Sequence, residues 1–544
     1  MVVIRKYIIQ VFYFLSLIFV KELNFLHYNS TDSPDFAEYF RYFEYNIGIL
    51  EYSTREQGLF YYYLNSWYFY LNNFPLSAEN FYIYLNRSIQ ELNFIFFLIG
   101  SLGFYFLLKS YNFSKNTIYL SLLALNFFPV VLALRLIFKP EIMAFSFLPW
   151  IIFYLEKFKL TKKFKYLLLA IPLAVISVAA KGSIFVCFGL FFLIFYFKNL
   201  IISNKKFVTI FLLIGLMLFL LISFEDSRNN GRNLLDIESG STSRENYDYK
   251  APLETVYKIN LFNLVTSPIQ HNHADSFLSI TLLDTFGDYF NLYWNNDSSN
   301  YLKNRKEVIN YQVSNEIKSP EISNKDLSLT VFFQKDTDIY LRQSLGLVAS
   351  LVFYLLILKK IIKRKKYNKF LLSPFVGMAA VLFHAISGFP VNNYDPFVGD
   401  TFKTLYSSFF IALCFVFLCA NIFKKGRLNS LKIFTYILLV IFLIGFPKEN
   451  NSEYQNMISQ TNNYSSLCKI NKTYLKIVTN NNNEYLNCEI SERVDIKLYN
   501  PYEKHEAYSN KPKFGFTNLI LGVGAFLSLL FNIYENFYML KRRK

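Results

Sequence analysis

Residues 117–156 read TIYLSLLALNFFPVVLALRLIFKPEIMAFSFLPWIIFYLE, two apolar runs separated by a short charged turn. Each run is close to the roughly 20 residues that a helix needs to cross about 30 Å of hydrocarbon. Pro140 breaks a helix, and Glu141 suits the first turn of the next one. The stretch therefore predicts two membrane-crossing helices, joined by a turn that carries Arg135 and Lys139.

The same pattern of apolar runs recurs along the chain. The 544 residues are 53% hydrophobic with a mean hydropathy of +0.24, which is too apolar for a soluble protein. We expect an all-α polytopic membrane protein with about 12 transmembrane helices. The expected spans are residues 7–26, 92–108, 117–137, 141–156, 164–180, 183–199, 207–224, 341–358, 370–388, 403–423, 432–446 and 516–539.

Positive charge orients these spans. Arg5 and Lys6 precede the first span and no small-x-small cleavage site follows, so this span is expected to stay as a signal anchor. With the amino terminus inside, alternate connections and the basic tail hold about half of the 56 Lys and Arg residues and a single acid, Glu156. Both termini are therefore predicted to be cytoplasmic, in a bacterial inner (plasma) membrane.

The same orientation places the long polar segments outside. The expected units are a membrane module, a large outward loop, further membrane helices, a second outward loop and a last helix with a basic tail, at residues 1–224, 225–340, 341–446, 447–515 and 516–544. The first module includes an outward loop of its own, residues 27–91. Apolar stretches at 60–74 and 277–293 predict short helices that lie against the membrane.

The net charge and the positions of the cysteines are explained by the expected membrane topology. The formal charge of +17 reflects orientation in the membrane and not nucleic-acid binding. Cys187, Cys414 and Cys419 fall in expected spans, as small buried hydrophobes do. Cys468 and Cys488 share the second outward loop, where a disulfide can persist, and the bridged and free states both stay open.

The first outward loop carries the candidate catalytic acids. Residues 31–39 read TDSPDFAEY, and Pro34 suits a first helical position. A helix here would place Asp35 and Glu38 near one face, just outside the first span. One interpretation is capping and compensation of the helix dipole. The other is a general base, Asp32 or Asp35, that takes a proton from an acceptor group.

Three cations lie at turns assigned to the outside: Arg135, Lys139 and Lys181. Snorkelling to lipid head groups explains any one of them. Because Arg offers a bidentate fork and Lys a point charge, the three together favour a phosphate or pyrophosphate site. Lys403 and Tyr406, one helical turn apart, are expected to reach the same head group.

The large outward loop adds two further groups. His271, His273 and Asp275 have a spacing compatible with a metal ion, but two surface histidines in a polar loop are the commoner case. On a helix, Asp284 and Asp288 would share a face, where their repulsion favours a cation or sugar hydroxyls between them. A bend at the glycine between them is the alternative.

In order and chemistry these features resemble the GT-C glycosyltransferases, multi-span enzymes that take a sugar from a polyprenyl-phosphate carrier on the outer side of the membrane. The resemblance is carried by an acidic first outward loop, a Lys-Pro-Glu turn, a Lys-Gly-Ser turn and a later span that opens with Lys and Tyr, at residues 32 and 35, 139–141, 181–183, and 403 and 406. It is closest over about the first 200 residues.

The resemblance implies roles for these residues. The first-loop acid, Asp32 or Asp35, would be the catalytic base or help to hold a divalent metal. Basic and aromatic groups on the outward turns are candidates for binding the donor phosphate: Arg135, Lys139, Lys181, Lys403 and Tyr406. Nearby acids are candidates for binding the substrate: Glu38, Glu141, Asp284 and Asp288.

The expected partners are a polyprenyl-phosphate-linked sugar, membrane lipids, and a lipid, glycan or protein acceptor, with no nucleic acid. Direct displacement by the acceptor would invert the anomeric carbon. A fixed group of cations can stabilise the departing phosphate without reorganising. A divalent metal would help but is not required, so metal dependence is left open.

Three other functions fit parts of the pattern. A polysaccharide polymerase or ligase would use the same lipid-linked donors. A lipid-linked glycan transporter or flippase should show paired broken helices and charge near mid-span, whereas the ionisable residues here cluster at span ends and His384 is almost the only polar candidate at depth. A receptor or assembly scaffold would need no chemistry.

Overall fold

The computed structural model describes helical and strand segments together with a few connecting residues. They are residues 2–26, 42–48, 58–73, 81–229, 253–266, 268, 273, 276–286, 327–331, 339–362, 368–387, 404–424, 436, 475–479 and 510–542. Apart from one pair of short strands, their regular structure is helical. This architecture is compatible with the helical membrane protein that the sequence predicts.

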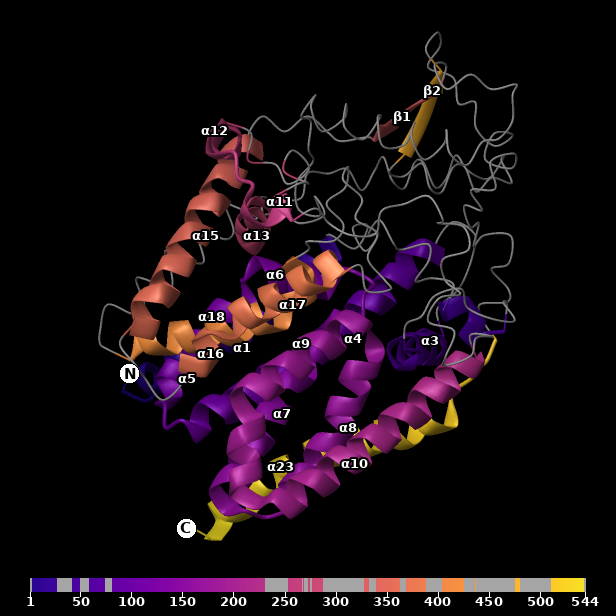
Figure 1. Cartoon of the computed structure of the whole chain (residues 1–544), viewed down its shortest axis with the longest axis vertical. Coiled ribbons are helices and arrows are strands. Elements are labelled where there is room, and N and C mark those ends of the chain that lie inside the picture. Colours follow the sequence, from indigo (N-terminus) through magenta and orange to yellow (C-terminus); the bar gives the residue numbers. More distant parts are fainter. Residues whose placement is uncertain are drawn as a thin grey trace.

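Helices of the N-terminal half form most of the bundle (Figure 1). They are α1 (Val2–Leu26), α3 (Phe60–Asn72), α4 (Phe81–Ser110), α5 (Lys115–Asn126), α6 (Pro129–Leu136), α7 (Glu141–Thr161), α8 (Lys165–Ala180), α9 (Gly182–Phe192), η2 (Leu193–Phe197) and α10 (Lys198–Asn229). Helix α3 confirms the short helix expected near residues 60–74, and its first residues, Phe60–Tyr63, are buried.

The remaining elements follow the large outward segment. They are α11 (Glu254–Tyr257), α12 (Leu261–Thr266), α13 (Phe277–Phe286), α15 (Ile339–Ile362), α16 (Asn368–Leu371), α17 (Ser373–Ser387), η6 (Thr404–Ser407), α18 (Ser408–Phe423) and α23 (Phe516–Arg542). Strands β1 (Leu327–Val331) and β2 (Leu475–Thr479) pair antiparallel, with Leu327 opposite Thr479. Helix α13 confirms the first ten residues of the helix expected over 277–293.

Five helical stretches in the described residues are long and apolar enough to cross a membrane: Arg87–Ser110, Gly182–Asp226, Gln343–Ile362, Thr404–Phe423 and Phe516–Glu535. A sixth is obtained if α5 and α6 form one bent span. The total of about 12 therefore stays a prediction. Among the expected spans, 432–446 lies outside the described residues except for Tyr436.

Two breaks in the helical stretches have identifiable causes, the first inside an expected span and the second between two expected spans. The span expected at 117–137 is broken, with α5 and α6 inclined at 60°. Pro129, the first residue of α6, has no N–H to continue the hydrogen bonding of α5. The stretch Gly182–Asp226 holds two expected spans, and its backbone leaves the helix at Asn204 (φ −167°, ψ 93°). The Asn204 side chain accepts a hydrogen bond from the Phe207 N–H and so begins the second helix.

The helices divide into a buried interior and an apolar periphery. In the apolar stretch of α18, 89% of the residues are buried, against 17% for Gly182–Asp226. Large apolar side chains such as Phe12 of α1, Leu213 of α10, Leu355 of α15 and Phe526 of α23 are exposed. An outer surface of this kind is stable in hydrocarbon and not in water. Figure 1 shows α10 and α23 side by side at one edge of the bundle and α15 at the opposite edge.

Close packing of α4 on α7 fixes the interior. A Cβ added at Gly100 would lie 2.7 Å from the Phe145 ring, and one at Gly103 would lie 2.7 Å from Trp150 Nε1. Small residues allow two helix backbones to approach this closely. The Trp150 indole N–H also donates to the Ile99 carbonyl at 2.9 Å, so α7 is held in register on α4.

Candidate functional site

The first turn of α7 and the residue before α9 meet through an ion pair. Lys181 Nζ lies 2.6 Å from Glu141 Oε1. Glu141 is fully buried and Lys181 is 8% exposed. A carboxylate in the first turn of a helix is stabilised by the helix dipole, and its pairing with an ammonium offsets the cost of removing both from water. Both residues were singled out from the sequence, and the structure joins them.

A short 3-10 turn, η6, contacts this pair through Tyr406 and bonds a further predicted residue, Asp284, through its backbone. Lys181 Nζ lies 4.6 Å from the centroid of the Tyr406 ring. The Thr404 N–H, at the start of the same turn, donates to Asp284 Oδ2 at 3.3 Å. We name the four residues Glu141, Lys181, Asp284 and Tyr406 the Lys181 cluster. They come from α7, the α8–α9 junction, α13 and η6, which are far apart in the sequence.

Arg135 lies at the break between α5 and α6. It is fully buried, its Nη2 donates to the Asn126 carbonyl at 3.0 Å, and its Cζ lies 4.5 Å from the Phe97 ring centroid. Asn126 is the last residue of α5, where helix carbonyls lack partners within the helix. The guanidinium therefore compensates the negative end of α5. These contacts do not connect Arg135 with the Lys181 cluster.

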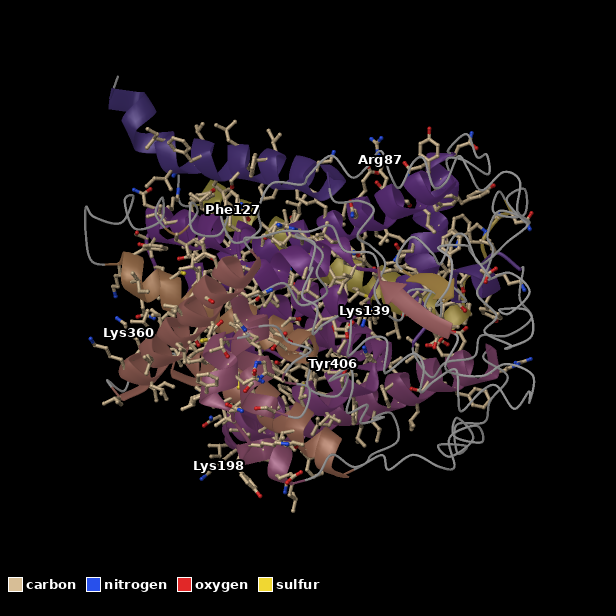
Figure 2. All side chains as sticks on the ribbon, turned by 90° about the horizontal axis from the view of Figure 1, so that it is seen from above. Arg87, Phe127, Lys139, Lys198, Lys360 and Tyr406 are labelled. Atoms are coloured by element: carbon tan, nitrogen blue, oxygen red, sulfur yellow. The ribbon has the colours of Figure 1, made fainter. Side chains whose placement is uncertain are left out.

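The turn that holds Lys139 is fixed by two residues that the sequence did not single out. Asn93 Nδ2 donates to the Ile137 carbonyl at 2.8 Å, and Tyr61 Oη donates to Asn93 Oδ1 at 2.8 Å. Lys139 itself is fully buried, two residues before Glu141. Asn93 is a polar residue at the start of an expected apolar span, and this position was the only sign in the sequence that it has a role. In Figure 2, Lys139 and Tyr406 lie towards the middle of the molecule, whereas Lys198 and Lys360 lie at its edge.

The first outward loop reaches the same end of the bundle. The Gly58 N–H donates to the Ala180 carbonyl at 3.3 Å, directly before Lys181. A Cβ at Gly58 would lie 2.4 Å from the Ala179 carbonyl oxygen, so only glycine fits this approach. The predicted residues Asp32, Asp35, Glu38, Asp288 and Lys403 lie outside the described residues.

Two further acids, at the end of α10, were missed from the sequence. Glu225 accepts from the N–H groups of Thr517 and Asn518 at 3.1 Å each and so caps the start of α23. Asp226 accepts from the Leu59 N–H at 3.1 Å, directly before α3. Burial, and then the negative charges of Asp226 and Glu225, raise the pKa of the nearby Tyr45. This pair ties together three segments that the charge pattern assigns to the outside.

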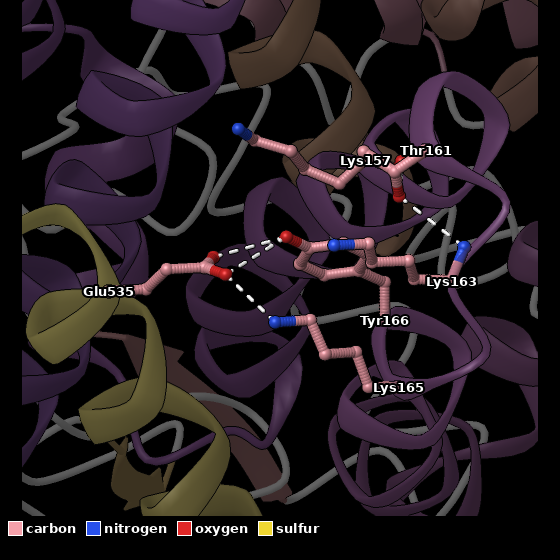
Figure 3. Close-up of polar contacts among 6 residues, drawn as sticks. All are labelled: Lys157, Thr161, Lys163, Lys165, Tyr166 and Glu535. Carbon is pink, nitrogen blue, oxygen red and sulfur yellow. Dashed lines mark hydrogen bonds and ion pairs between the residues drawn. The ribbon is translucent and has the colours of Figure 1, made fainter. Parts of the chain in front are cut away.

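The opposite end of the bundle carries separate acid–base pairs. Lys369 and Tyr196 both donate to Glu156 Oε1. Figure 3 shows Glu535 of α23 facing Lys165 and Tyr166 at the start of α8, with Lys165 Nζ at 2.9 Å and Tyr166 Oη at 3.0 Å from Oε1. All these residues belong to turns or helix ends that the charge pattern assigns to the inside.

The sequence left open a metal site and a disulfide. Within the described residues, no group of three or more His, Cys, Asp or Glu side chains is arranged to hold a metal ion. His273 is buried, whereas His271 and Asp275 lie outside the part that the structure describes. Cys468 and Cys488 also lie outside it. The three span cysteines are free thiols and buried, as expected.

Comparison with known proteins gives no family. No family model matches the chain, and no curated protein matches it significantly. What the site can do therefore depends on its own chemistry. A buried ammonium between a carboxylate and an aromatic ring, with a second buried lysine in the adjoining turn, suits an anionic group that carries hydroxyls nearby.

Proposed function

We propose that the chain is a membrane glycosyltransferase of the GT-C kind. It moves a sugar from a polyprenyl-phosphate donor to a lipid, glycan or protein acceptor on the outer face of the membrane. One observation carries the proposal: three predicted site residues of the Lys181 cluster, Glu141, Lys181 and Tyr406, contact one another from separate segments, and the fourth, Asp284, bonds the same short turn as Tyr406. A shared pocket for donor and acceptor needs such a convergence.

The separation of contacts between the two ends supports the orientation. The expected outward turns at Glu141, Lys181 and Tyr406 contact one another. The expected inward residues contact one another in the same way, as in Lys165 with Glu535. If the spans alternate in direction, outward turns can contact only outward turns, and inward turns only inward turns. The orientation itself remains part of the proposal.

In the proposed reaction, Lys181 and Lys139 stabilise the negative charge that develops on the departing lipid phosphate. Fixed cations in a site removed from water do this without reorganisation. A first-loop carboxylate, Asp32 or Asp35, takes the proton from the acceptor as its oxygen or nitrogen attacks the anomeric carbon. Arg135 supports the cation-bearing turn by holding the end of α5.

The test uses membranes that contain the protein and a radiolabelled polyprenyl-phosphate sugar. The double variant Glu141→Gln/Lys181→Met removes the ion pair without leaving one charge buried alone, and it should lower sugar transfer at least ~100-fold. Lys165→Met/Glu535→Gln makes the same change at the other end and should keep near wild-type transfer. Asp32→Asn and Asp35→Asn, assayed separately, identify the base. Full activity in the first double variant and in both aspartate variants would contradict the proposal.

A second candidate, a lipid-linked glycan transporter, is favoured by the break between α5 and α6 with Arg135 beside it. Broken helices with a charged residue at depth are common at transport sites. Reconstituted vesicles separate the two functions. A transporter moves the intact lipid-linked sugar between leaflets, whereas a transferase releases the sugar from its phosphate.

A further inference from the structure

The start of α9 has an open helix N-terminus. Lys181, the residue before the helix, is extended (φ −163°, ψ 140°) and its side chain makes no capping hydrogen bond. The N–H groups of Ile184 and Phe185 donate to the Lys181 carbonyl at 3.1 Å. The two earlier N–H groups, those of Gly182 and Ser183, are the donors that a helix leaves for other partners.

A buried hydroxyl lies beside these donors. Ser183 is 8% exposed, and within the described residues its Oγ has no hydrogen-bond partner. Side chains in the first helical turn lean towards the N-terminus, so this hydroxyl lies on the side of the open N–H groups. Gly182 is exposed, and a Cβ built on it would meet nothing within 4 Å. The helix end is therefore accessible beside Gly182 and lined by a buried polar group.

The local charge selects an anion. The positive end of the α9 dipole and the ammonium of Lys181 act at the same place. Glu141 holds this ammonium at 2.6 Å. A carboxylate partner keeps the lysine charged and in position beside the helix end.

We infer that the N-terminus of α9 seats the phosphate of the lipid carrier, which is a diester in the sugar donor and a monoester in the polyprenyl phosphate that remains after transfer. The N–H groups of Gly182 and Ser183, the Ser183 hydroxyl and Lys181 donate to its oxygens. This inference rests on the proposed function, because the group placed there is the phosphate of the lipid donor. It assigns the phosphate contacts to Gly182 and Ser183 in addition to the predicted cations.

The sharpest test removes one backbone donor. Proline is favoured at the first helical position, and the residue before a proline must be extended, as Lys181 is. Gly182→Pro therefore deletes an N–H group while α9 can still form. Gly182→Ala is the matched control, since it keeps the N–H and places its Cβ in open space. The probe is radiolabelled polyprenyl phosphate without sugar, bound to the full-length protein in lipid nanodiscs.

Gly182→Pro should weaken binding of this lipid about five- to ten-fold, and Gly182→Ala should change it less than about two-fold. A second pair guards against misfolding. Ser183→Ala should weaken binding to a similar degree, while Ser177→Ala should not. Ser177 is fully buried in α8 and bonds the Leu173 carbonyl of its own helix. Wild-type affinity in both Gly182→Pro and Ser183→Ala would overturn the inference.

Competition with inorganic phosphate identifies the source of the anion. Displacement of the lipid only at far higher concentrations of inorganic phosphate indicates a site for the lipid head group. Equal competition indicates a site for free phosphate, and failure of both ligands to bind overturns the inference. Because no sugar or acceptor is present, the binding result is independent of whether the protein transfers sugar.

Discussion

The two ends of the bundle use the same residue types in different surroundings. At one end, the side chains of Lys181 and Glu141 are 9% and 0% exposed. At the other, those of Lys165 and Glu535 are 42% and 27% exposed. Coulomb attraction is strong only where water is excluded, and there each charge depends on its partner. The other end also holds a largely buried pair, Glu156 with Lys369, whose side chains are 11% and 17% exposed. The two ends therefore differ in how completely their ion pairs are removed from water, and the pair at Lys181 is the most completely removed of the three.

The largest expected effect comes from breaking the buried pair on one side only. Lys181→Met leaves the carboxylate of Glu141 buried without its counter-charge, which should reduce the free energy of unfolding by about 3–5 kcal/mol. Thermal unfolding of the purified protein in detergent measures this loss. Adding Glu141→Gln should restore part of it, because the uncompensated charge is then removed. A single variant as stable as the wild type would mean that the pair carries no such energy.

A smaller but sizeable effect is expected at the closest backbone contact of the same end. In Gly58→Ala, the new methyl would lie 2.4 Å from the Ala179 carbonyl oxygen. The first outward loop must shift, at a cost of about 1–3 kcal/mol. Gly189→Ala in α9 is the control, since its Cβ meets nothing within 4 Å. The unfolding midpoint should fall in the first variant alone, and equal midpoints would contradict the assigned contact.

The sequence could predict the residues of this end better than the contacts between them. A proline between two charged residues marks the turn at Lys139 and Glu141, because the local chemistry ends one helix and begins another. For Glu141 and Lys181, the sequence could predict that both lie on the same side of the membrane, but not that they pair. Which of several outward charges meet depends on helix packing, and no local pattern encodes that. The placement of Asp284 beside Thr404 depends on it in the same way.

The bend between α5 and α6 was harder to predict than the positions of the spans, for a related reason. Hydropathy averages over a window of about 19 residues and so reports length rather than direction. Pro129 gave a sign of the break before α6, which lies inside the span expected at 117–137, whereas the break at Asn204 falls in the connection expected between the spans 183–199 and 207–224. The role of Arg135 follows from the first break. Arg135 donates to the Asn126 carbonyl at the end of α5, and its expected contact with a phosphate stays a prediction.

A third prediction compares matched tyrosines at the two ends. Tyr61→Phe removes the hydrogen bond to Asn93 and leaves the buried Asn93 Oδ1 without this donor, which should cost about 1–2 kcal/mol. It should also lower sugar transfer, because Asn93 holds the turn before Lys139. Tyr166→Phe removes a partly exposed bond to Glu535, and its effect should be smaller on stability and absent from transfer. Equal effects on transfer would remove the distinction between the ends.

The smallest expected effect is at the exposed pair. Lys165→Met should change the free energy of unfolding by less than about 1 kcal/mol, since water and salt screen a charge pair of this exposure. Raising the salt concentration should abolish the small difference, whereas the loss in Lys181→Met should persist, because counter-ions reach a buried pair poorly. Unfolding midpoints of both variants at low and high salt provide the measurement. If salt reduced both losses equally, the pair at Lys181 would be as open to solvent as the pair at Lys165, and the case for a water-excluded site at that end would be lost.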